Sequence, residues 1–493
     1  MAAQTVTLVA RGGRQVQFVE KDPAVGGVKD VYFAPDRSYV VAFYRKDPDA
    51  AGRERLERLV TTYRRNLLEK EGGSYYKDLF RWPECLVEHN GRTGIVVPVY
   101  DRRFYFPAGT GLDGVEKQGN WFTSAKNFNR NLPPGERGNL ISYLRICVTL
   151  SRAVKRLHAA GLAHSDLSFK NCLVDPSSGS ACIIDIDGLV VPGLFPPEVA
   201  GTPDFIAPEV MGTIKLPLGD PAKKLPCVDT DRHALAVLVY LYLLHRHPLR
   251  GSKVWSLEDE EQESLEMGEK ALFIEHPTDP TNRRTVDPKT DGPFLPWIDT
   301  GRLPYTITGP YLSRLFRAAF VDHLHDPVRR PTADDWEEAL VKTLDLILPC
   351  SGPSCPKSWF VFDNTRRPVC PYCGKAYGEP SVPVLDLYST RDGSLYQPDN
   401  RRLMVFNNQY LYPWHAYRNV FPNGLLAPEQ RRPLGYFAFH RGEWLLVNQD
   451  LPGLRDGEVP VPVGQAVKLS DRQRLVLSPG AGGRLAHVTL VRS

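Results

Sequence analysis

The sequence predicts an α+β protein of several domains, and three observations point to that class. An N-terminal stretch of short alternating apolar and polar runs, typical of antiparallel strands, is followed by a long stretch of helical patterns. Four clustered cysteines come next, and the remainder returns to short strand-like runs broken by Gly, Pro, Asn and Asp. The expected domains are a strand-rich small lobe at 1–100, a helical large lobe at 101–348, a cysteine module at 349–380 and an all-β sandwich at 381–493.

The composition narrows the class of protein further. At 493 residues two to four domains are expected, and 24% charged with 42% hydrophobic residues is typical of a soluble globular chain. The net charge of +4 is too small to indicate a nucleic-acid-binding tail. No basic segment followed by an apolar core opens the chain, and the longest apolar run, 234–244, is shorter than the ~20 residues of a membrane span. We therefore expect a cytoplasmic protein that binds neither nucleic acid nor a membrane.

The small lobe is expected to begin with three antiparallel strands within residues 6–45. The turn between the first two contains Gly26 and Gly27, and glycines in such a turn let backbone N–H groups approach a phosphate closely. An amphipathic helix is predicted over 53–69, and a further strand over 94–100.

Two stretches of the large lobe carry groups suited to catalysis. Residues 164–171 read His-Ser-Asp-Leu-Ser-Phe-Lys-Asn, and residues 183–188 read Ile-Ile-Asp-Ile-Asp-Gly. They resemble the catalytic loop and the metal-binding Asp-Phe-Gly turn of the protein-kinase superfamily. Phosphoryl transfer needs a carboxylate that takes the hydroxyl proton, and an amide oxygen and a second carboxylate that hold magnesium over the phosphates of ATP. The resemblance makes Asp166 the base, and Asn171 and Asp185 the Mg²⁺ ligands.

Further motifs of the same family follow in the expected order. Residues 201–209 resemble the end of a kinase activation segment, and residues 325–332 resemble the closing motif of the large lobe. In the family, the residues matching Glu209 and Arg330 form an ion pair, and the one matching Asp231 braces the catalytic loop. The resemblance covers about two thirds of the chain and implies a bilobal protein-kinase fold.

The lysine with which kinases bind the phosphates is missing from its usual strand. That strand matches residues 39–45, where Ala42 or Tyr44 stands in its place, depending on register. With-no-lysine kinases supply a lysine from the glycine-rich loop region instead, and Lys29 falls there. A relocated ammonium can reach the same oxygens, because only a positive point charge is required. The alternative is that Lys29 is a solvated turn lysine.

The resemblance also implies the remaining contacts to the nucleotide. The helix at 53–69 would supply a glutamate that pairs with the phosphate-binding lysine, either Glu57, which we prefer, or Glu54. A surface charge is the other interpretation, since this helix is dense in Arg and Glu. The adenine would bond to backbone groups at the end of the strand over 94–100. The expected nucleotide contacts are Gly26, Gly27, Lys29, Glu57, Val97, Val99, Asn171 and Asp185.

Several positions depart from the family pattern. Ser165 replaces the arginine that binds a phosphorylated activation segment, so activity is not expected to need that phosphorylation. Lys170 stands where tyrosine kinases place an arginine, and its positive charge could neutralise charge on the transferring phosphoryl group. By the family resemblance, Gly201 and Thr202 favour acceptor hydroxyls of the Ser/Thr type. Asp187 replaces the glycine of the metal-binding turn if Asp185 is the ligand; a loop two residues longer would make Asp187 the ligand instead.

A finer resemblance concerns segments 41–45, 184–188 and 276–284, which are similar to bacterial kinases associated with tellurium-resistance gene clusters. That resemblance implies a protein substrate and, as further partners, a von Willebrand A-type domain protein and a 2C-type protein phosphatase. Residues 248–310 form a polar insertion, which contains the segment 276–284. The acidic run 258–263 of this insertion is interpreted as a solvated helix face.

The cysteine module has the spacing of a zinc ribbon. Its residues are Cys350, Cys355, Cys370 and Cys373. Four thiolates suit tetrahedral Zn²⁺ in a structural role, because they leave no open position for water. Disulfides and a redox Cys-x-x-Cys are the alternatives; the five other cysteines stand singly, as in a reducing compartment, which disfavours disulfides.

The C-terminal segment 381–493 is predicted to be an all-β sandwich whose closing strands resemble forkhead-associated domains, which bind phosphothreonine. The recognition Arg-Ser pair of that family has no clear counterpart here. The basic candidates Arg418, Arg432 and Arg441 are interpreted equally well as surface charges. We expect a protein-interaction domain, forkhead-associated-like in fold.

Taken together, the motifs favour a Ser/Thr protein kinase that moves the γ-phosphoryl group of ATP to a protein hydroxyl, with Asp166, Lys170 and Lys29 as catalytic residues. The competing hypothesis is a pseudokinase scaffold that binds nucleotide and partner proteins without transfer. Transfer of AMP is disfavoured, because Asp166 is available as a base.

Overall fold

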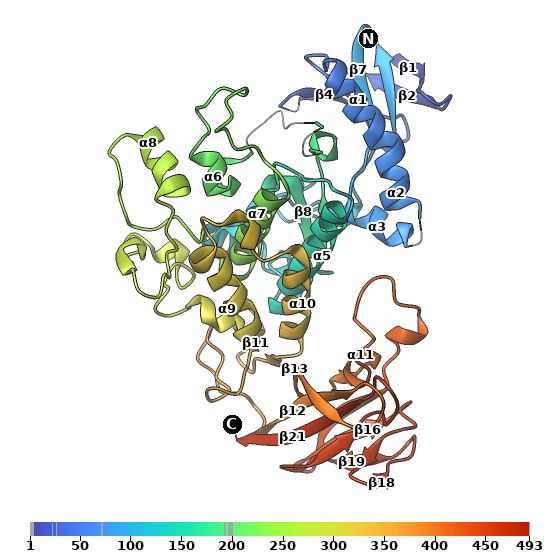
Figure 1. Cartoon of the computed structure of the whole chain (residues 1–493), viewed down its shortest axis with the longest axis vertical. Coiled ribbons are helices and arrows are strands. Elements are labelled where there is room, and N and C mark those ends of the chain that lie inside the picture. Colours follow the sequence, from blue (N-terminus) through green and yellow to red (C-terminus); the bar gives the residue numbers. More distant parts are fainter. Residues whose placement is uncertain are drawn as a thin grey trace. The chain divides into compact units, whose positions relative to one another are not determined.

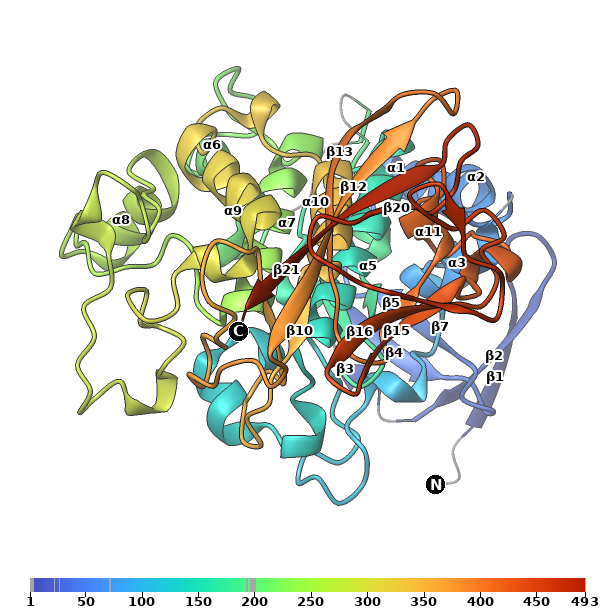
Figure 2. The ribbon, with the colours of Figure 1, turned by 90° about the horizontal axis from the view of Figure 1, so that it is seen from below.

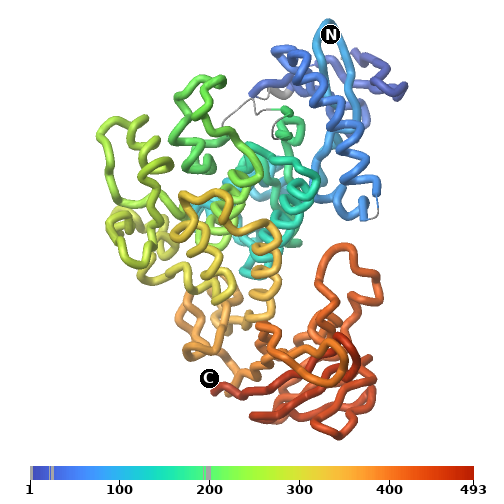
Figure 3. Tube along the Cα trace, in the orientation of Figure 1, coloured from blue at the N-terminus to red at the C-terminus, as the bar shows by residue number. Residues whose placement is uncertain are grey.

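The structure of the chain is a computed structural model. It describes residues 4–21, 23–25, 27–70, 72–191, 194–195 and 201–492, so the predicted phosphate contact Gly26 lies outside the described residues. The chain divides into two compact units (Figure 3). The first unit comprises Met1–Gly138, Arg145–Thr300 and Leu315–Glu337, and the second comprises Asn139–Leu144, Gly301–Arg314 and Glu338–Ser493. The four predicted domain ranges stay predictions.

The small lobe of the first unit is built on a five-stranded antiparallel sheet in the order β3-β4-β5-β7-β6. Along β5, Val41 and Phe43 are buried on one face against the β1–β2 hairpin, where Phe18 meets Phe43 edge-on. Alternate residues therefore point to the opposite face of the sheet. The strands are β1 (Gln4–Val9), β2 (Gln15–Glu20), β3 (Ala24–Val25), β4 (Lys29–Phe33), β5 (Tyr39–Tyr44), β6 (Cys85–His89) and β7 (Arg92–Pro98).

The helix predicted over 53–69 is present but begins earlier and is interrupted (Figure 1). Asp49 caps its first turn, because the Asp49 carboxylate accepts a hydrogen bond from the Gly52 N–H at 2.8 Å. A π-helical turn over Leu59–Tyr63 then separates two α-helical parts. The helices of this region are α1 (Ala50–Arg58), α2 (Arg64–Leu68) and α3 (Gly73–Leu79).

The rest of the first unit is largely helical and surrounds α7 (Val228–Leu244). From Ala234 to Leu244 every residue of α7 is buried, as its apolar pattern predicts for a core helix. Among the described residues, no helix combines the length and the apolar character that a membrane crossing requires. Its other elements are α4 (Asn120–Thr123), β8 (Cys172–Asp175), β9 (Ser180–Ile183), α6 (Pro208–Met211) and α8 (Asp259–Ser264). Three helices have residues in both units: α5 (Leu140–Ala159), α9 (Pro310–Arg317) and α10 (Ala333–Leu344).

The second unit holds the cysteine module and, over the C-terminal segment, a β-structure of two sheets with the short helix α11. One sheet has the order β13-β12-β21-β20-β17-β18, in which β12 and β21 run side by side (Figure 2); the other has the order β14-β15-β16-β19. Buried residues from both sheets, such as Leu385, Phe437 and Leu475, form one apolar core. The likeness to forkhead-associated domains stays a prediction.

The elements of the second unit are β10 (Ile347–Pro349), β11 (Trp359–Val361), β12 (Ser381–Thr390), β13 (Tyr396–Met404), β14 (Tyr410–Leu411), α11 (Pro413–Ala416), β15 (Gly435–His440), β16 (Glu443–Asn448), β17 (Arg455–Asp456), β18 (Val459–Pro460), β19 (Ala466–Lys468), β20 (Arg474–Val476) and β21 (Arg484–Arg492). The buried carboxylate of Asp345, at the end of α10, accepts hydrogen bonds from Arg401 at 2.7 Å and from His415 at 3.1 Å. This contact joins the last helix of the predicted large lobe to the sandwich within one unit.

Candidate functional site

A pocket in the first unit lies between the sheet of the small lobe and the turn that follows β9. Its lining includes apolar side chains, among them Val31, Ala42, Val97 and Ile184. Lys29 contacts both Asp185 and Asp187, and these three residues form what is called the charged end of the pocket. Further charged and polar lining residues are Lys170, Asn171, Arg81 and Glu116. An apolar slot that opens onto paired cations and carboxylates suits a ligand with a flat apolar part and an anionic tail.

The register of β4 and β5 shows which residues of the two strands share a face of the sheet. Lys29 lies directly opposite Tyr44, and Val31 lies directly opposite Ala42. Residues opposite each other in an antiparallel pair point to the same face, so these side chains all lie on the pocket side of the sheet. Ala42 lines the pocket, whereas Tyr44, which lies opposite Lys29, donates a hydrogen bond to the Asp187 carboxylate.

The ammonium group of Lys29 is the cation at the centre of the charged end. Its Nζ lies 2.7 and 2.8 Å from the two carboxylate oxygens of Asp187 and 3.2 Å from Oδ1 of Asp185. Burial alone would lower the pKa of Lys29, but the charges of Asp187 and Asp185 outweigh burial and hold that pKa above its ordinary value. Lys29 therefore carries a full positive charge in the pocket and is not a solvated turn lysine.

The turn after β9 contributes both carboxylates that meet Lys29. Asp185 adopts a left-handed backbone conformation with φ of 61°, and the turn Ile186–Gly188 brings Asp187 inward. The Asp187 side chain is 8% exposed and that of Asp185 is 53% exposed. A left-handed non-glycine residue is uncommon, and such positions are concentrated at functional sites. The sequence motif predicts Asp187 only as a residue that replaces a glycine or as an alternative metal ligand. The Asp-x-Asp spacing of Asp185 and Asp187 was the one feature of the sequence that could have indicated a shared contact.

The loop at 164–171 holds Asp166 and Asn171 together. The side-chain amide of Asn171 donates to the backbone carbonyl of Asp166 at 2.8 Å and to its Oδ2 at 3.0 Å. The other carboxylate oxygen, Oδ1, accepts bonds from the N–H of Thr202 at 2.7 Å and from its hydroxyl at 2.8 Å. Asp166 is thus oriented from two sides, by its own loop and by the segment that begins at Gly201.

The brace predicted for this loop is present. The buried carboxylate of Asp231, in the first turn of α7, accepts hydrogen bonds from the N–H of His164 at 2.7 Å and of Ser165 at 3.2 Å. The imidazole Nε2 of His164 lies 2.9 Å from the carbonyl oxygen of Ile184, next to Asp185. These bonds connect the loop that carries Asp166 with the turn that carries Asp185.

Glu57 is not brought to Lys29, so the expected pairing of the two is wrong for this structure. The Glu57 carboxylate is 46% exposed and forms an ion pair with Arg11. Glu54, the alternative, pairs with Arg58 at 2.6 Å. The physical reason is the orientation of α1, whose buried charged residue is Arg55 and not a glutamate.

The other predicted contacts are placed as follows. Gly27 and Lys170 both line the pocket, and Lys170 is exposed to solvent. Val97 and Val99 line the apolar side. The N–H of Val99, however, already donates to the carbonyl oxygen of Ser38 at 3.1 Å, so that amide is engaged within the protein.

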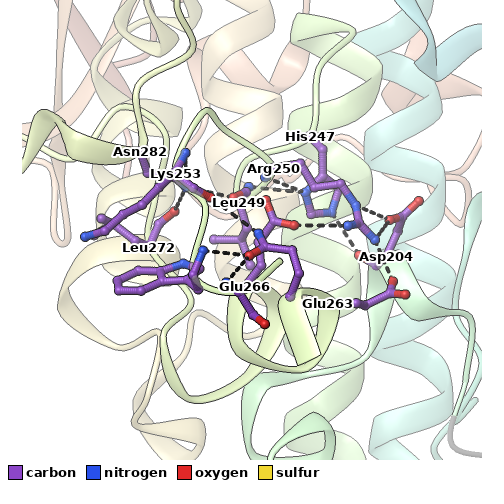
Figure 4. Close-up of polar contacts among 12 residues, drawn as sticks. Asp204, His247, Leu249, Arg250, Lys253, Glu263, Glu266, Leu272 and Asn282 are labelled. Atoms are coloured by element: carbon purple, nitrogen blue, oxygen red, sulfur yellow. Dashed lines mark hydrogen bonds and ion pairs between the residues drawn. The ribbon is translucent and has the colours of Figure 1, made fainter. Parts of the chain in front are cut away.

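A polar network anchors the segment that follows Thr202 to the insertion (Figure 4). The guanidinium of Arg250 lies 2.6 Å from Oδ1 of Asp204, 2.8 Å from Glu263 and 3.3 Å from Glu266. His247 holds the same residue, because its Nε2 lies 2.9 Å from the carbonyl oxygen of Asp204. Glu263 belongs to the acidic run expected to be a solvated helix face, and its side chain is 41% exposed although it pairs with Arg250. Sequence reasoning did not find this cluster, since its members are distant in the chain.

The four cysteines of the second unit gather in one place. Their sulfur atoms all lie within 4.8 Å of one another, with Cys350 and Cys373 at 3.3 Å and Cys355 and Cys370 at 3.7 Å. Four ligands at the usual Zn–S distance of ~2.3 Å would place sulfurs ~3.8 Å apart in a tetrahedron. The N–H of Gly352 points at the Cys350 sulfur from 3.3 Å, and a Cβ on this glycine would lie 2.9 Å from the Cys373 sulfur. The group can hold a metal ion such as zinc.

Comparisons with known proteins add little to this geometry. A scan against protein-family models gives no match, and no curated protein is similar enough in sequence to match. Among solved structures, the kinase domain of a specific rhoptry antigen of Toxoplasma gondii is similar, with 16% identity over 52% of this chain and 75% of that chain and a TM-score of 0.35.

Proposed function

We propose that the chain is a Ser/Thr protein kinase that transfers the γ-phosphoryl group of ATP to a protein hydroxyl. The observation that carries the proposal is the convergence of four groups at one end of one pocket: Lys29, Asn171, Asp185 and, bonded to Asn171, the carboxylate of Asp166. Phosphoryl transfer needs positioning and charge stabilisation more than covalent chemistry, and these groups supply both.

Each group has a distinct role in this proposal. The apolar end of the pocket would receive the adenine, and Lys29 would bind the phosphate oxygens. Asp166 would accept the proton of the attacking hydroxyl as the new P–O bond forms and the bond from the γ-phosphorus to ADP breaks. Lys170, at the same end, would offset the charge on the transferring group.

The residues present also fit magnesium. Both hydrogens of the Asn171 amide are donated to Asp166, which leaves the amide oxygen as its remaining polar group. The Asp185 carboxylate is half exposed in the pocket. Amide and carboxylate oxygens are the ligands that Mg²⁺ prefers, and the ion would neutralise phosphate charge when bound.

The acceptor side of the site favours activity without phosphorylation of the activation segment. Asp166 is oriented by Thr202, and Asp204 is held by Arg250 and His247. These bonds involve only unmodified residues. In the family, the arginine that Ser165 replaces binds the phosphorylated activation segment. Its absence would therefore not lower the activity of a kinase that works without that phosphorylation.

The second unit would then be a structural and interaction module, with Zn²⁺ bound by the four cysteines. The placement among tellurium-cluster kinases remains part of the proposal, and so do the von Willebrand A-type and 2C-type phosphatase partners. The forkhead-associated likeness remains part of the proposal, and its three basic candidates, Arg418, Arg432 and Arg441, are all exposed surface residues.

The second candidate function is the pseudokinase scaffold, and one observation favours it. Lys29 is already neutralised by Asp187 and Asp185, as it would be in a pocket that has lost catalysis. The two candidates differ in whether label moves from ATP to protein.

The deciding experiment incubates the purified chain with magnesium and γ-labelled ATP, with Asp166→Ala as the test variant. Asp450→Ala, an exposed aspartate of the second unit, is the matched control. We expect label on Ser or Thr of the protein or of a generic acceptor, lost in Asp166→Ala and kept in Asp450→Ala. Nucleotide that raises the melting temperature without any transfer favours the scaffold. Label that reaches protein from α-labelled ATP, in a parallel reaction, would show AMP transfer instead.

A further inference from the structure

Lys29 has an anchor of an unexpected kind. We propose that Asp187, assisted by Tyr44, is the positioning residue that holds Lys29 at the phosphate end of the pocket, in place of a carboxylate from helix α1. The proposal rests on the proposed function, because it concerns how the same pocket binds phosphates.

Asp187 and Asp185 contact Lys29 in different ways. Asp187 uses both carboxylate oxygens, at 2.7 and 2.8 Å, and both side chains of this pair are largely buried. Asp185 uses one oxygen at 3.2 Å and is half exposed. Charges attract more strongly where water is excluded, so the contact with Asp187 is the stronger one. We infer that Asp187 remains on Lys29 when nucleotide binds, and that a phosphate oxygen takes the place of Asp185.

Tyr44 completes the anchor. Its hydroxyl donates a hydrogen bond to Oδ2 of Asp187, and its ring centroid lies 5.4 Å from Nζ of Lys29. Burial and the charge of Asp187 raise the pKa of Tyr44 well above its ordinary value, so the hydroxyl stays protonated and remains a donor. Tyr44, one of the two residues that stand where the strand lysine is missing, therefore orients the partner of Lys29.

Helix α1 does not offer an alternative anchor. Both of its glutamates, Glu54 and Glu57, are engaged by arginines at the surface. The charged residue that α1 buries is Arg55, and a guanidinium cannot accept a hydrogen bond from Lys29. A carboxylate on the pocket side of the lysine must therefore come from elsewhere, and Asp187 supplies it.

The arrangement has a functional consequence. The residue that would hold magnesium, Asp185, and the residue that anchors the lysine, Asp187, are two positions apart on one short turn. That turn is connected to the catalytic loop through His164, which contacts the carbonyl of Ile184. One turn would thus fix the positions of both the metal ligand Asp185 and the phosphate-binding ammonium of Lys29. The orientation of α1 would then not control activity.

The test compares four variants of the full chain: Lys29→Met, Asp187→Asn, the double variant, and Glu57→Gln. We expect Lys29→Met and Asp187→Asn each to lower transfer on the order of 100-fold, and the double variant to be no worse than either, because the two residues act as one unit. Glu57→Gln is expected to change transfer less than about twofold. Effects of Lys29→Met and Asp187→Asn that multiply, or a large loss in Glu57→Gln, would overturn the proposal.

A readout independent of activity separates this proposal from the proposed function. Each single variant leaves one buried charge without its partner, whereas the double variant removes both charges. The double variant is therefore expected to melt at a higher temperature than either single variant, and Tyr44→Phe should weaken binding of a non-hydrolysable ATP analogue several-fold. If the wild type transfers nothing but the melting temperatures follow this order, the proposed function fails and the anchor stands. Additive losses of melting temperature contradict the anchor.

Discussion

Arg330 and Glu209 are joined by two parallel hydrogen bonds of 2.8 and 2.7 Å. The Arg330 side chain is 1% exposed, and the same guanidinium donates to the backbone carbonyls of Asp229 and Leu324. Planar bidentate pairs of this kind fix orientation as well as distance. The pair ties the segment that ends at Glu209 to the start of α7 and to the loop before α10, and so supports the position of Thr202 beside Asp166.

Replacing Arg330 with Met should destabilise the first unit strongly. The change leaves the Glu209 carboxylate and two backbone carbonyls without their donor, and breaking a buried ion pair costs on the order of 3–5 kcal/mol. Arg329→Met is the matched control, since the Arg329 side chain is 69% exposed and 3.8 Å from its partner Asp326. That change should cost less than about 0.5 kcal/mol. Urea unfolding measures both, and equal costs would show that the buried pair does not stabilise the fold.

Metal binding by the cysteine cluster makes a separate prediction. We expect one zinc per chain by elemental analysis, and loss of that zinc in Cys370→Ser. Cys147→Ser, at a buried cysteine outside the cluster, should keep the metal. Because structural zinc contributes on the order of 10 kcal/mol to folding of small modules, a chelator should lower the melting temperature of the wild type and leave that of Cys370→Ser unchanged. Retention of zinc in Cys370→Ser would contradict this assignment.

The stability of the first unit should depend on pH through His247. Burial lowers the pKa of His247 to about 4, although the nearby Asp204 opposes the shift. The ring is neutral in the fold, because Nε2 faces the carbonyl oxygen of Asp204 while Nδ1 accepts from the N–H groups of Leu249 and Arg250 at 3.2 and 3.3 Å. The unfolded chain binds a proton below its ordinary pKa of ~6.5, whereas the folded chain does not.

Stability is therefore expected to fall as the pH drops from 6.5 to 4, with a contribution from this residue on the order of 3 kcal/mol. His247→Gln removes the titrating group, so its unfolding free energy should vary less with pH over that window. Urea unfolding at several pH values measures the difference. Other buried histidines, such as His233, change stability in the same direction in both proteins and cancel in the comparison.

The sequence predicted the parts of the site that are encoded within short motifs. Asp166 and Asn171 are five residues apart in one loop, so their proximity follows from local geometry alone. The partner of Lys29 could not be found in this way, because Asp187 lies 158 residues further along the chain. The choice of Glu57 failed for a related reason: in a helix dense in Arg and Glu, periodicity does not reveal which charge is buried.

The contact between Arg250 and Asp204 gives the last prediction. Asp204 lies two residues after Thr202, whose hydroxyl bonds to Asp166, and Arg250 holds it at 2.6 Å. Arg250→Ala should loosen this segment and raise the KM for the protein acceptor about 5–10-fold, a rough estimate for a lost charge-assisted contact, with little change in the KM for ATP. Lys253→Ala is the matched control from the same insertion, since Lys253 contacts Trp255 and Thr281 instead.

Steady-state kinetics with varied acceptor and varied ATP separates the two KM values. Arg250→Lys keeps a charge but not the forked geometry that reaches three carboxylates, so it should restore only part of the acceptor affinity. A change confined to the KM for ATP would instead place the effect of Arg250 in the nucleotide pocket. A melting temperature close to that of the wild type keeps the kinetic comparison meaningful, because loss of folded enzyme lowers the apparent kcat without changing either KM.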